Sequence, residues 1–467
     1  MTRETKYRLF YLVADSCSVL ISSLLLNTIR FYWEAPNGIW ATLDNYLFNT
    51  KSYFVYLSLW AFWLLLFALS GYYNKPLNKS RIEDIWTTFS TVVLGTGIEF
   101  LLLIVDDPVH DTKGYLKLFF SLMFTSFLLV YSFRFIVTWY AIQQRNRKEF
   151  WPKILLIGTK KQVEELAAAA YEMRFTPQQK LFFEDFYKKG SSDLAIEAIT
   201  REVSTIFDNT PPTEIYLAST QEESSNVGHL LYKLYHYRCP IRITAEGMMP
   251  LPSIKTTFLH GIPLVDVTET KMSEGAKNVK WCFDRLASFS LLVLLSPLFL
   301  ILSILVRKSS RGEIFFSQER IGKRGKPFMI YKFRTMYKNS ERNGPQLSHD
   351  GDTRITPIGR ILRKYRLDEL PQLFNVLKGD MSFVGPRPER QFYIDLLVDR
   401  APYYYLLHNV LPGITSWGMV RYGYASNLDE MTERLKYDWL YYGNMSLKMD
   451  LTVLFHTISV LVKGAGK

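Results

Sequence analysis

The sequence predicts a membrane protein in three parts: an α-helical membrane bundle, an α/β Rossmann-like middle domain, and a mostly α-helical domain that carries a re-entrant membrane helix. Three observations predict this fold class. Four apolar stretches fill the first third of the 467 residues, strands and helices alternate after them, and a fifth apolar stretch broken by proline opens the remainder. These changes of pattern place the three parts at residues 1–148, 149–275 and 276–467.

Composition narrows the classes of partner. Hydrophobic residues make up 48% of the chain, and the formal net charge is +12. A basic balance suits an anionic membrane surface, a phosphorylated substrate or a nucleic acid. The cations stand beside membrane segments and prolines, and no nucleic-acid-binding module is evident. We therefore expect membrane lipid, and no nucleic acid, as a partner.

The apolar stretches of the first part are predicted to cross the membrane. They cover residues 10–29, 53–69, 86–105 and 115–137, and each is close to the ~20 residues that span a bilayer. Basic residues lie before the first stretch, between the second and third, and after the fourth. Because basic loops stay in the cytoplasm, both ends of the bundle are expected there.

Two acids, Asp15 and Glu99, lie within these apolar stretches. An acid inside a membrane helix can mark a functional site. The alternative is that each acid lies near an interface or forms a hydrogen bond inside the bundle, so their roles stay open.

The middle part alternates strands with helices. Strands are expected at residues 153–158, 213–218 and 240–244, and helices at 159–173 and 222–237. This alternation indicates a parallel α/β sheet. The turn after the first strand keeps only Gly158 of the three glycines in a dinucleotide-binding turn, so we expect no bound dinucleotide. The domain is then structural, regulatory or dimer-forming, and we expect a homodimer.

The fifth apolar stretch lies within a predicted membrane helix at residues 281–307. Ser296 and Pro297 stand at its centre, where proline removes a helix hydrogen bond and bends the axis. Both flanks are basic. We expect a re-entrant helix that enters and leaves by the cytoplasmic face, and a kinked transmembrane helix is the alternative.

Charged clusters follow this helix. The first, between Phe316 and Met336, is rich in cations, and arginine forks match phosphate oxygens. It suits a diphosphate substrate or, alternatively, a surface lying on lipid headgroups. In a later segment, Pro386 and Pro388 stiffen the chain around Arg387.

The second cluster is the acid pair Asp368–Glu369. Cations surround it in sequence, and cations depress carboxyl pKa values and keep the groups ionised. They are Arg354, Arg360, Arg363 and Arg366. An ionised carboxylate can attack phosphorus, and its neighbour can bind Mg2+, although an acid pair also occurs at ordinary helix starts.

The region 278–467 closely resembles the bacterial polyprenyl-phosphate hexose-1-phosphate transferases, the monotopic phosphoglycosyl transferases. The resemblance rests on FDR before the broken helix, its Ser-Pro, and the segments FFSQERIGKRGKPFMIYKFRTM, LDELPQLFNVLKGDMSFVGPRPE and LPGIT in this order. The spans and the middle domain resemble the large subgroup, which initiates exopolysaccharide, capsule or O-antigen synthesis.

The resemblance implies a reaction and a place. Asp368 resembles the nucleophile and Glu369 the magnesium ligand. Sugar-1-phosphate would pass from a UDP-sugar, UDP-glucose or UDP-galactose by default, through an aspartyl phosphosugar to undecaprenyl phosphate, with release of UMP. The enzyme would lie in the bacterial inner membrane, its site facing the cytoplasm. The residues assigned to substrate binding are Arg320, Lys332, Arg334, Arg354, Arg360, Arg363, Pro386, Arg387, Pro388 and Glu389.

The sequence departs from the family's pattern at one motif, and two other functions are alternatives. Ser416-Trp-Gly-Met419 stands where the family often has Gly-Trp-Ala-Gln, which leaves the sugar open. A membrane nucleotide-sugar dehydratase would need a glycine-rich turn and a Tyr-x-x-x-Lys pair, and the sequence has neither. A non-catalytic scaffold of a polysaccharide assembly complex predicts a decayed acid pair, yet Asp368 and Glu369 stand within an intact motif.

Overall fold

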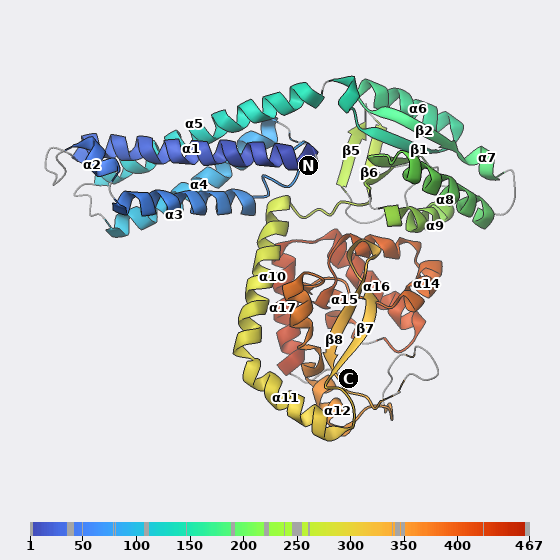
Figure 1. Cartoon of the computed structure of the whole chain (residues 1–467). Helices are drawn as coiled ribbons and strands as arrows, with labels where there is room; N and C mark the ends of the chain where they lie inside the picture. The colour runs from blue at the N-terminus through green and yellow to red at the C-terminus, as the bar shows by residue number, and fades with distance from the viewer. Residues whose placement is uncertain are drawn as a thin grey trace. The chain divides into compact units, whose positions relative to one another are not determined.

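The computed structural model divides the chain into two compact units (Figure 1). One unit is Met1–Phe150 with Ser273–Val279, and the other is Trp151–Met272 with Lys280–Lys467. The structure describes residues 3–34, 42–48, 50–77, 79, 81–106, 112–145, 147–187, 192–218, 224–237, 239–244, 255–259, 262–338, 340, 346, 351–423 and 425–462.

The first unit is a helical bundle. Its helices are α1 (Arg3–Glu34), α2 (Leu43–Leu47), α3 (Thr50–Leu69), α4 (Arg81–Asp106) and α5 (Thr112–Arg145). All except the short α2 are long and apolar enough to cross a membrane, which confirms the four predicted apolar helices. The helix α1 lies beside α3 and α5, and aromatic and aliphatic side chains from all four long helices fill the space between them.

Both acids of the apolar stretches form hydrogen bonds inside the bundle. Asp15 accepts hydrogen bonds from Arg134 of α5 and from the Tyr73 hydroxyl, at 2.7 Å and 2.6 Å. Glu99 accepts one from the Trp63 indole at 3.0 Å. Asp15 and Arg134 are fully buried, so their charges neutralise each other away from water.

The second unit begins with a six-stranded sheet in the order β2-β1-β3-β4-β6-β5. Its strands are β1 (Lys153–Gly158), β2 (Thr176–Phe182), β3 (Glu214–Ala218), β4 (Ile241–Thr244), β5 (Lys255–Leu259) and β6 (Ile262–Asp266). The helices along this stretch are η2 (Lys148–Phe150), α6 (Lys160–Glu172), α7 (Phe183–Tyr187), α8 (Ser192–Asn209), α9 (Ser224–Leu234) and η4 (Tyr235–Tyr237).

The three predicted strands are present and parallel, but the sheet is mixed. The strand β6 runs antiparallel to both β4 and β5. The prediction of a parallel sheet is therefore wrong at this edge. Only two residues separate β5 from β6, which is enough for an antiparallel hairpin and far too short for a parallel crossover.

The glycine turn after β1 serves packing. A Cβ at Gly158 would lie 2.2 Å from the carbonyl oxygen of Ala218 on β3, so only glycine fits there. The Glu184 carboxylate accepts the backbone N–H of Lys160, the first residue of α6, at 3.0 Å. A protein carboxylate thus occupies the helix start, where dinucleotide-binding sheets place a pyrophosphate.

The remaining helices run from α10 (Glu274–Leu294), through α11 (Ser296–Ser309), α12 (Pro357–Lys364), η7 (Leu367–Glu369), α13 (Gln372–Lys378), α14 (Gln391–Arg400), η8 (Pro402–Asn409), α15 (Trp417–Arg421) and α16 (Leu428–Gly443), to α17 (Leu447–Val462). Four short strands accompany them. They are β7 (Phe315–Ile321) and β8 (Pro327–Phe333), joined through η6 (Lys323–Gly325), and the parallel pair β9 (Ser382–Val384) and β10 (Gly413–Thr415).

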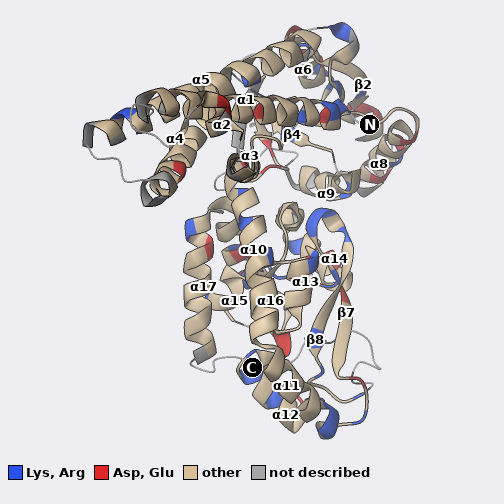
Figure 2. Ribbon diagram, turned by 60° about the vertical axis from the view of Figure 1, so that its left-hand side comes forward, with Lys and Arg blue, Asp and Glu red and all other residues tan. Residues whose placement is uncertain are grey.

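The apolar pair α10–α11 is bent by 64° at the predicted Ser-Pro break. Pro297 has no N–H to bond the carbonyl of Val293 four residues earlier. The Ser296 hydroxyl donates to that carbonyl instead, at 2.8 Å. The sequences of α10 and α11 hold no charged residue between Arg285 and Arg307. The tan ribbon over most of this stretch in Figure 2 illustrates it. The apolar stretch between Arg285 and Arg307 carries the bend.

Candidate functional site

A pocket of about 740 Å³ opens in the C-terminal part of the second unit. Its size lies within the range of about 300–1,000 Å³ that is typical of small-molecule sites. The hairpin β7–β8, Asp368 of the acid pair, the segment after β9 and the helix α16 all contribute to its wall. The predicted site residues that line it are Arg320, Lys332, Arg334, Arg363, Asp368, Arg387 and Glu389.

The acid pair lies on the short helix η7, between α12 and α13. Arg366, the residue before η7, has φ 54°, a left-handed conformation that is unusual for any residue except glycine. This turn reverses the chain after α12, and Pro371 then starts α13. Asp368 and Glu369 are both buried as a result, with 5% and 3% of their surface exposed.

Glu369 is surrounded by cations from three segments. Its Oε1 lies 2.9 Å from Lys332 Nζ on β8 and 3.6 Å from Arg387 Nη1, and its Oε2 lies 3.8 Å from Arg366 Nη1. Burial alone would raise the pKa of Glu369, but these three cations outweigh it and lower that pKa to about 2. Glu369 is therefore ionised at any physiological pH.

Asp368 has a different environment. Burial raises its pKa above the usual range, because Lys332 and Arg363 compensate only in part. Its Oδ1 is buried and has no hydrogen-bond partner among the described residues. The expectation that the nearby arginines depress both carboxyl pKa values is thus right for Glu369 and wrong for Asp368, which forms no ion pair within the described chain.

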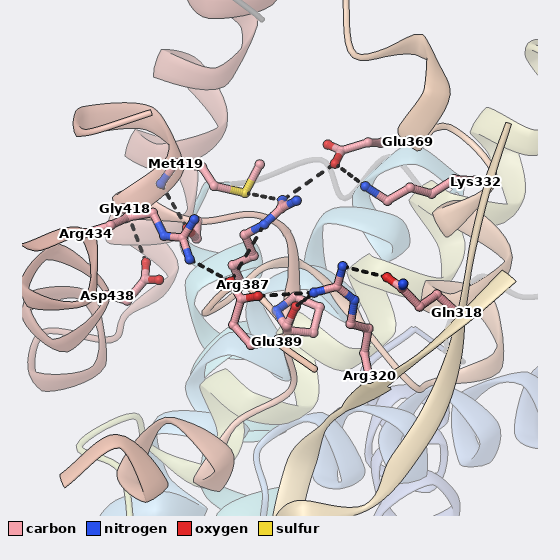
Figure 3. Close-up of polar contacts among 12 residues, drawn as sticks. Gln318, Arg320, Lys332, Glu369, Arg387, Glu389, Gly418, Met419, Arg434 and Asp438 are labelled. Carbon is pink, nitrogen blue, oxygen red and sulfur yellow. Dashed lines mark hydrogen bonds and ion pairs between the residues drawn. The ribbon is translucent and has the colours of Figure 1, made fainter. Parts of the chain in front are cut away.

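The segment Pro386–Glu389 is fixed from both sides. Gly413 N donates to the carbonyl of Pro386 at 2.9 Å, and Arg320 Nη1 donates to the carbonyl of Pro388 at 3.2 Å. Both prolines are buried, so they shape this segment rather than offering polar groups to a ligand. Arg387 between them points toward Glu369, as Figure 3 shows.

Glu389 lies against three arginines of the pocket (Figure 3). Its carboxylate lies 3.1 Å from Arg320, 2.6 Å from Arg434 and 4.0 Å from Arg387. Burial would raise the pKa of Glu389, but Arg434 and Arg320 lower it below its usual value. The pattern predicted Glu389 as a substrate-binding residue, whereas in the structure its carboxylate holds Arg320 and Arg434 in place.

Sequence patterns did not identify the helix α16 as part of the site. Arg434 of this helix contacts Glu389, and Asp438 one turn later accepts the N–H of Gly418 at 2.9 Å. The neighbouring Met419 places its sulfur 3.0 Å from Arg387 Nη1. The only sequence signal was the spacing of Arg434 and Asp438 by four residues, which puts both on one face of the helix.

Five predicted site residues are not among the residues that line the pocket: Glu369, Arg354, Arg360, Pro386 and Pro388. Arg354 forms a close ion pair with Asp352, at 2.6 Å, and also contacts Gln346. Arg360 is exposed on α12. Arg363 is closer to the acid pair and donates to the Thr335 hydroxyl at 2.9 Å. Local pairing with Asp352, two residues away, explains why Arg354 turns from the acid pair.

The C-terminal region of the chain is similar to known sugar transferases. Residues 275–464 match the family model described as "Bacterial sugar transferase". A UDP-N-acetylgalactosamine-undecaprenyl-phosphate N-acetylgalactosaminephosphotransferase of Aeromonas hydrophila is 44% identical over 40% of this chain and 44% of the relative. A UDP-glucose:undecaprenyl-phosphate glucose-1-phosphate transferase of Klebsiella pneumoniae is 31% identical over 52% of this chain and 53% of the relative.

These two matches span about half the length of the relatives. A shorter relative, the uncharacterized sugar transferase EpsL of Bacillus subtilis, is 37% identical over 40% of this chain, and the match covers 89% of the relative. The matched region contains the broken helix, the acid pair and the pocket. The chain therefore belongs to the bacterial sugar transferase family.

Proposed function

We propose that this protein transfers a sugar-1-phosphate from a UDP-sugar to undecaprenyl phosphate, as the first membrane step of polysaccharide or glycoconjugate synthesis. One observation carries the proposal. Asp368 presents a buried carboxylate oxygen without a partner in a pocket whose wall is rich in arginine and lysine. This arrangement fits a nucleophile that faces a diphosphate. The functions for which the Aeromonas and Klebsiella relatives are named support the same reaction.

The first step is a displacement at the β-phosphorus of the donor. An oxygen of Asp368 forms a bond to this phosphorus, and the bond from phosphorus to the bridging oxygen breaks. The electron pair leaves with UMP, and an aspartyl phosphosugar remains. Lys332 and Arg387 stand next to the acid pair, where they would stabilise the charge that develops on the phosphoryl oxygens.

The second step regenerates the enzyme. A phosphate oxygen of undecaprenyl phosphate attacks the same phosphorus, and the bond to Asp368 breaks with the electron pair returning to the carboxylate. The product is a lipid diphosphate sugar. Two successive displacements through a covalent intermediate give ping-pong kinetics.

Magnesium fits this site only together with the substrate. The described residues contain no cluster of three metal-ligating side chains. Mg2+ usually takes one or two carboxylates plus phosphate oxygens, and the unpartnered Oδ1 of Asp368 beside Glu369 matches that donor set. Glu369 would hold the ion, which would neutralise charge on the diphosphate.

The relatives support an order in which to test donor sugars. The sequence alone made UDP-glucose or UDP-galactose the default. The 44% identical relative acts on UDP-N-acetylgalactosamine, whereas the glucose transferase of Klebsiella is 31% identical. We therefore propose UDP-N-acetylgalactosamine as the first donor to test, followed by UDP-galactose and UDP-glucose.

The same proposal covers the arrangement in the cell. The bundle of residues 1–148 would anchor the enzyme in the inner membrane, and the domain of residues 149–275 would be structural or dimer-forming. The domain of residues 276–467 would be catalytic and face the cytoplasm. The bent pair α10–α11 would enter and leave by that face, because its charged residues lie only at its two ends.

The experiment is UMP release by purified protein with Mg2+, undecaprenyl phosphate and a panel of UDP-sugars. We expect release with one donor and its loss in Asp368→Asn. Folded wild-type protein that is silent with every donor would contradict the proposal and favour the scaffold function.

A further inference from the structure

Arg334 stands at the end of the apolar helix α11. It follows β8 directly, and its Nη2 donates to the carbonyl oxygens of Ser310 at 2.7 Å and Val306 at 3.4 Å. The side chain is 9% exposed. Leu300 and Ile301 on α11 are 64% and 54% exposed, which is the exposure expected of a helix that faces lipid. The guanidinium thus lies where this lipid-facing helix meets the pocket.

Capping of α11 uses only one nitrogen of this guanidinium. Nε and Nη1 of Arg334 are buried and have no hydrogen-bond partner among the described residues. Buried polar groups normally find a partner, and charged groups are especially costly to leave without one. Arg334 also lines the pocket that contains Asp368. Two orphaned donors of a permanent cation on a pocket wall fit an anionic ligand.

The guanidinium of Arg334 packs closely on the loop between α11 and β7. A Cβ at Gly312 would lie 2.2 Å from Arg334 Nη1, so any side chain there would displace the guanidinium. Gly312 also has φ +135°, which L residues rarely adopt. It lines the same pocket as Arg334. Glycine at this position therefore lets Nη1 approach the backbone of the loop between α11 and β7 without a side chain between them.

Arg334 differs from the other cations of the pocket. Lys332 and Arg387 are paired with Glu369, and Arg320 with Glu389. Arg334 forms no close ion pair in the described part of the chain, and Glu313 acts on it only as a nearby charge. Arg307, which donates to the carbonyl of Gly312, adds positive charge nearby. Because Nη2 is already held by backbone carbonyls, an anion would meet the charge of this guanidinium and single N–H bonds from Nε and Nη1 rather than a parallel pair.

We infer that Arg334 binds the phosphate monoester of the lipid acceptor, at a subsite separate from the donor diphosphate beside Asp368. The acceptor keeps its hydrocarbon chain in the bilayer, so its phosphate must enter the pocket along the lipid-facing helix. Arg334 is the pocket arginine that is bonded to the end of that helix. The assignment rests on the proposed function, since only a transferase with a lipid acceptor needs such a subsite.

The test separates the two half-reactions. Exchange of labelled UMP into the UDP-sugar needs no acceptor and reports the donor side alone. Transfer measured against undecaprenyl phosphate concentration in nanodiscs reports the acceptor side. For Arg334→Gln, we expect the loss in transfer to exceed the loss in exchange by about tenfold, through a higher KM for the acceptor. Arg334→Lys should recover part of the loss, because it keeps the charge without the fork.

Arg311→Gln is the matched control, since this exposed arginine near the same helix end does not line the pocket. It should leave both half-reactions near wild type. Equal losses of transfer and exchange in Arg334→Gln would overturn the assignment and point to the donor side or to a structural role. No loss in either would also overturn it. Absence of both half-reactions in the wild type would refute the proposed function itself.

A second arm separates the acceptor from bulk lipid. If Arg334 selects the acceptor, the KM difference between wild type and Arg334→Gln persists in nanodiscs that contain phosphatidylglycerol. Disappearance of that difference would mean that any anionic headgroup fills the site, and it would overturn the assignment.

Discussion

The helical bundle holds a buried pair of opposite charges, Asp15 and Arg134, and the C-terminal pocket holds a buried charged cluster. The two differ in how completely their described polar atoms are bonded. In the helical bundle, Nε and Nη2 of Arg134 bind both oxygens of Asp15 at 2.7 and 2.8 Å, and Nη1 binds the Thr88 hydroxyl at 3.0 Å. In the C-terminal pocket, Asp368 and Arg334 keep buried atoms that have no hydrogen-bond partner among the residues the structure describes.

We expect the fully bonded pair to serve stability and the unbonded atoms of the pocket to serve function. A buried pair whose donors and acceptors are all bonded has nothing left to offer a ligand, and breaking it is costly. A pocket that leaves buried donors and acceptors unbonded is less stable without its ligand than with it. Active sites commonly have this property. Variants of bonded and unbonded groups test this contrast.

Asp368→Asn should give the largest effect. An amide is a poor nucleophile, so we expect UMP release to fall at least about 1,000-fold while the free energy of unfolding changes little. Asp399→Asn on the exposed side of α14 is the control and should keep wild-type activity. Retention of a tenth of the activity in Asp368→Asn would show that another group is the nucleophile.

Arg134→Met should give the opposite result. It leaves the Asp15 carboxylate buried without its cation, and we expect the free energy of unfolding in detergent to fall by about 3–5 kcal/mol. UMP release per folded molecule should stay near wild type. Arg81→Met, at an exposed position of the same bundle, should cost much less. Lost activity with unchanged stability would break the contrast, because the bonded cluster would then be functional.

Glu389→Gln tests a bonded group inside the pocket. Glu389 holds Arg320 and Arg434, so its loss should misplace phosphate-binding groups and lower kcat/KM about 10- to 100-fold. Arg434→Lys should lower it less than Arg434→Met, since lysine keeps the charge. The control is Glu433→Gln, which removes an exposed acid of the same helix. An unchanged kcat/KM would mean that Arg320 and Arg387 do not depend on this anchor.

His408 provides an unbonded atom outside the pocket. Its Nε2 is buried without a partner among the described residues, and burial lowers the pKa of His408 to about 4, with His236 adding to the shift. The unfolded chain then binds the proton more tightly, so the stability is present above about pH 6.5 and is lost as pH falls toward 4. We expect a loss of about 1.4 kcal/mol between pH 7.5 and 5.5.

His408→Phe should flatten this pH dependence in urea titrations and leave UMP release at pH 7.5 near wild type. The ring stands between Tyr235 and Tyr404, where phenylalanine fits by size and character. An equally steep loss in the variant would assign the acid sensitivity to other groups. A large loss of activity would mean that this atom, too, serves the reaction.

Sequence reasoning succeeded where the physics is local. The spans follow from runs of apolar residues, and the break at Pro297 follows from its missing N–H. The acid pair and Arg387 could be identified because long motifs carry them. Their pKa values could not, since Asp368 and Glu369 are neighbours in sequence but only Glu369 lies against three cations.

Contacts between segments that are far apart in the chain could not be predicted from the sequence. Arg434 reaches Glu389 across 45 residues, and no pattern in the sequence links them. In the sequence, Arg354 and Arg363 have equivalent places among the arginines around the acid pair. In the structure, Arg354 forms an ion pair with the nearby Asp352. The antiparallel edge of the sheet was not predicted, because the sequences of β5 and β6 are only weakly strand-like. Only the short connection between these two strands indicates a hairpin.

The most direct test of the central claim is covalent labelling of the enzyme by its donor. Protein incubated with a UDP-sugar labelled in the sugar, with Mg2+ and without acceptor, should carry up to one label per chain after denaturation. The label should map to the peptide containing Asp368, be absent in Asp368→Asn, and disappear when undecaprenyl phosphate is added. Transfer of the sugar without any labelled protein, under conditions where the donor is turned over, would contradict the two-step account built on this carboxylate.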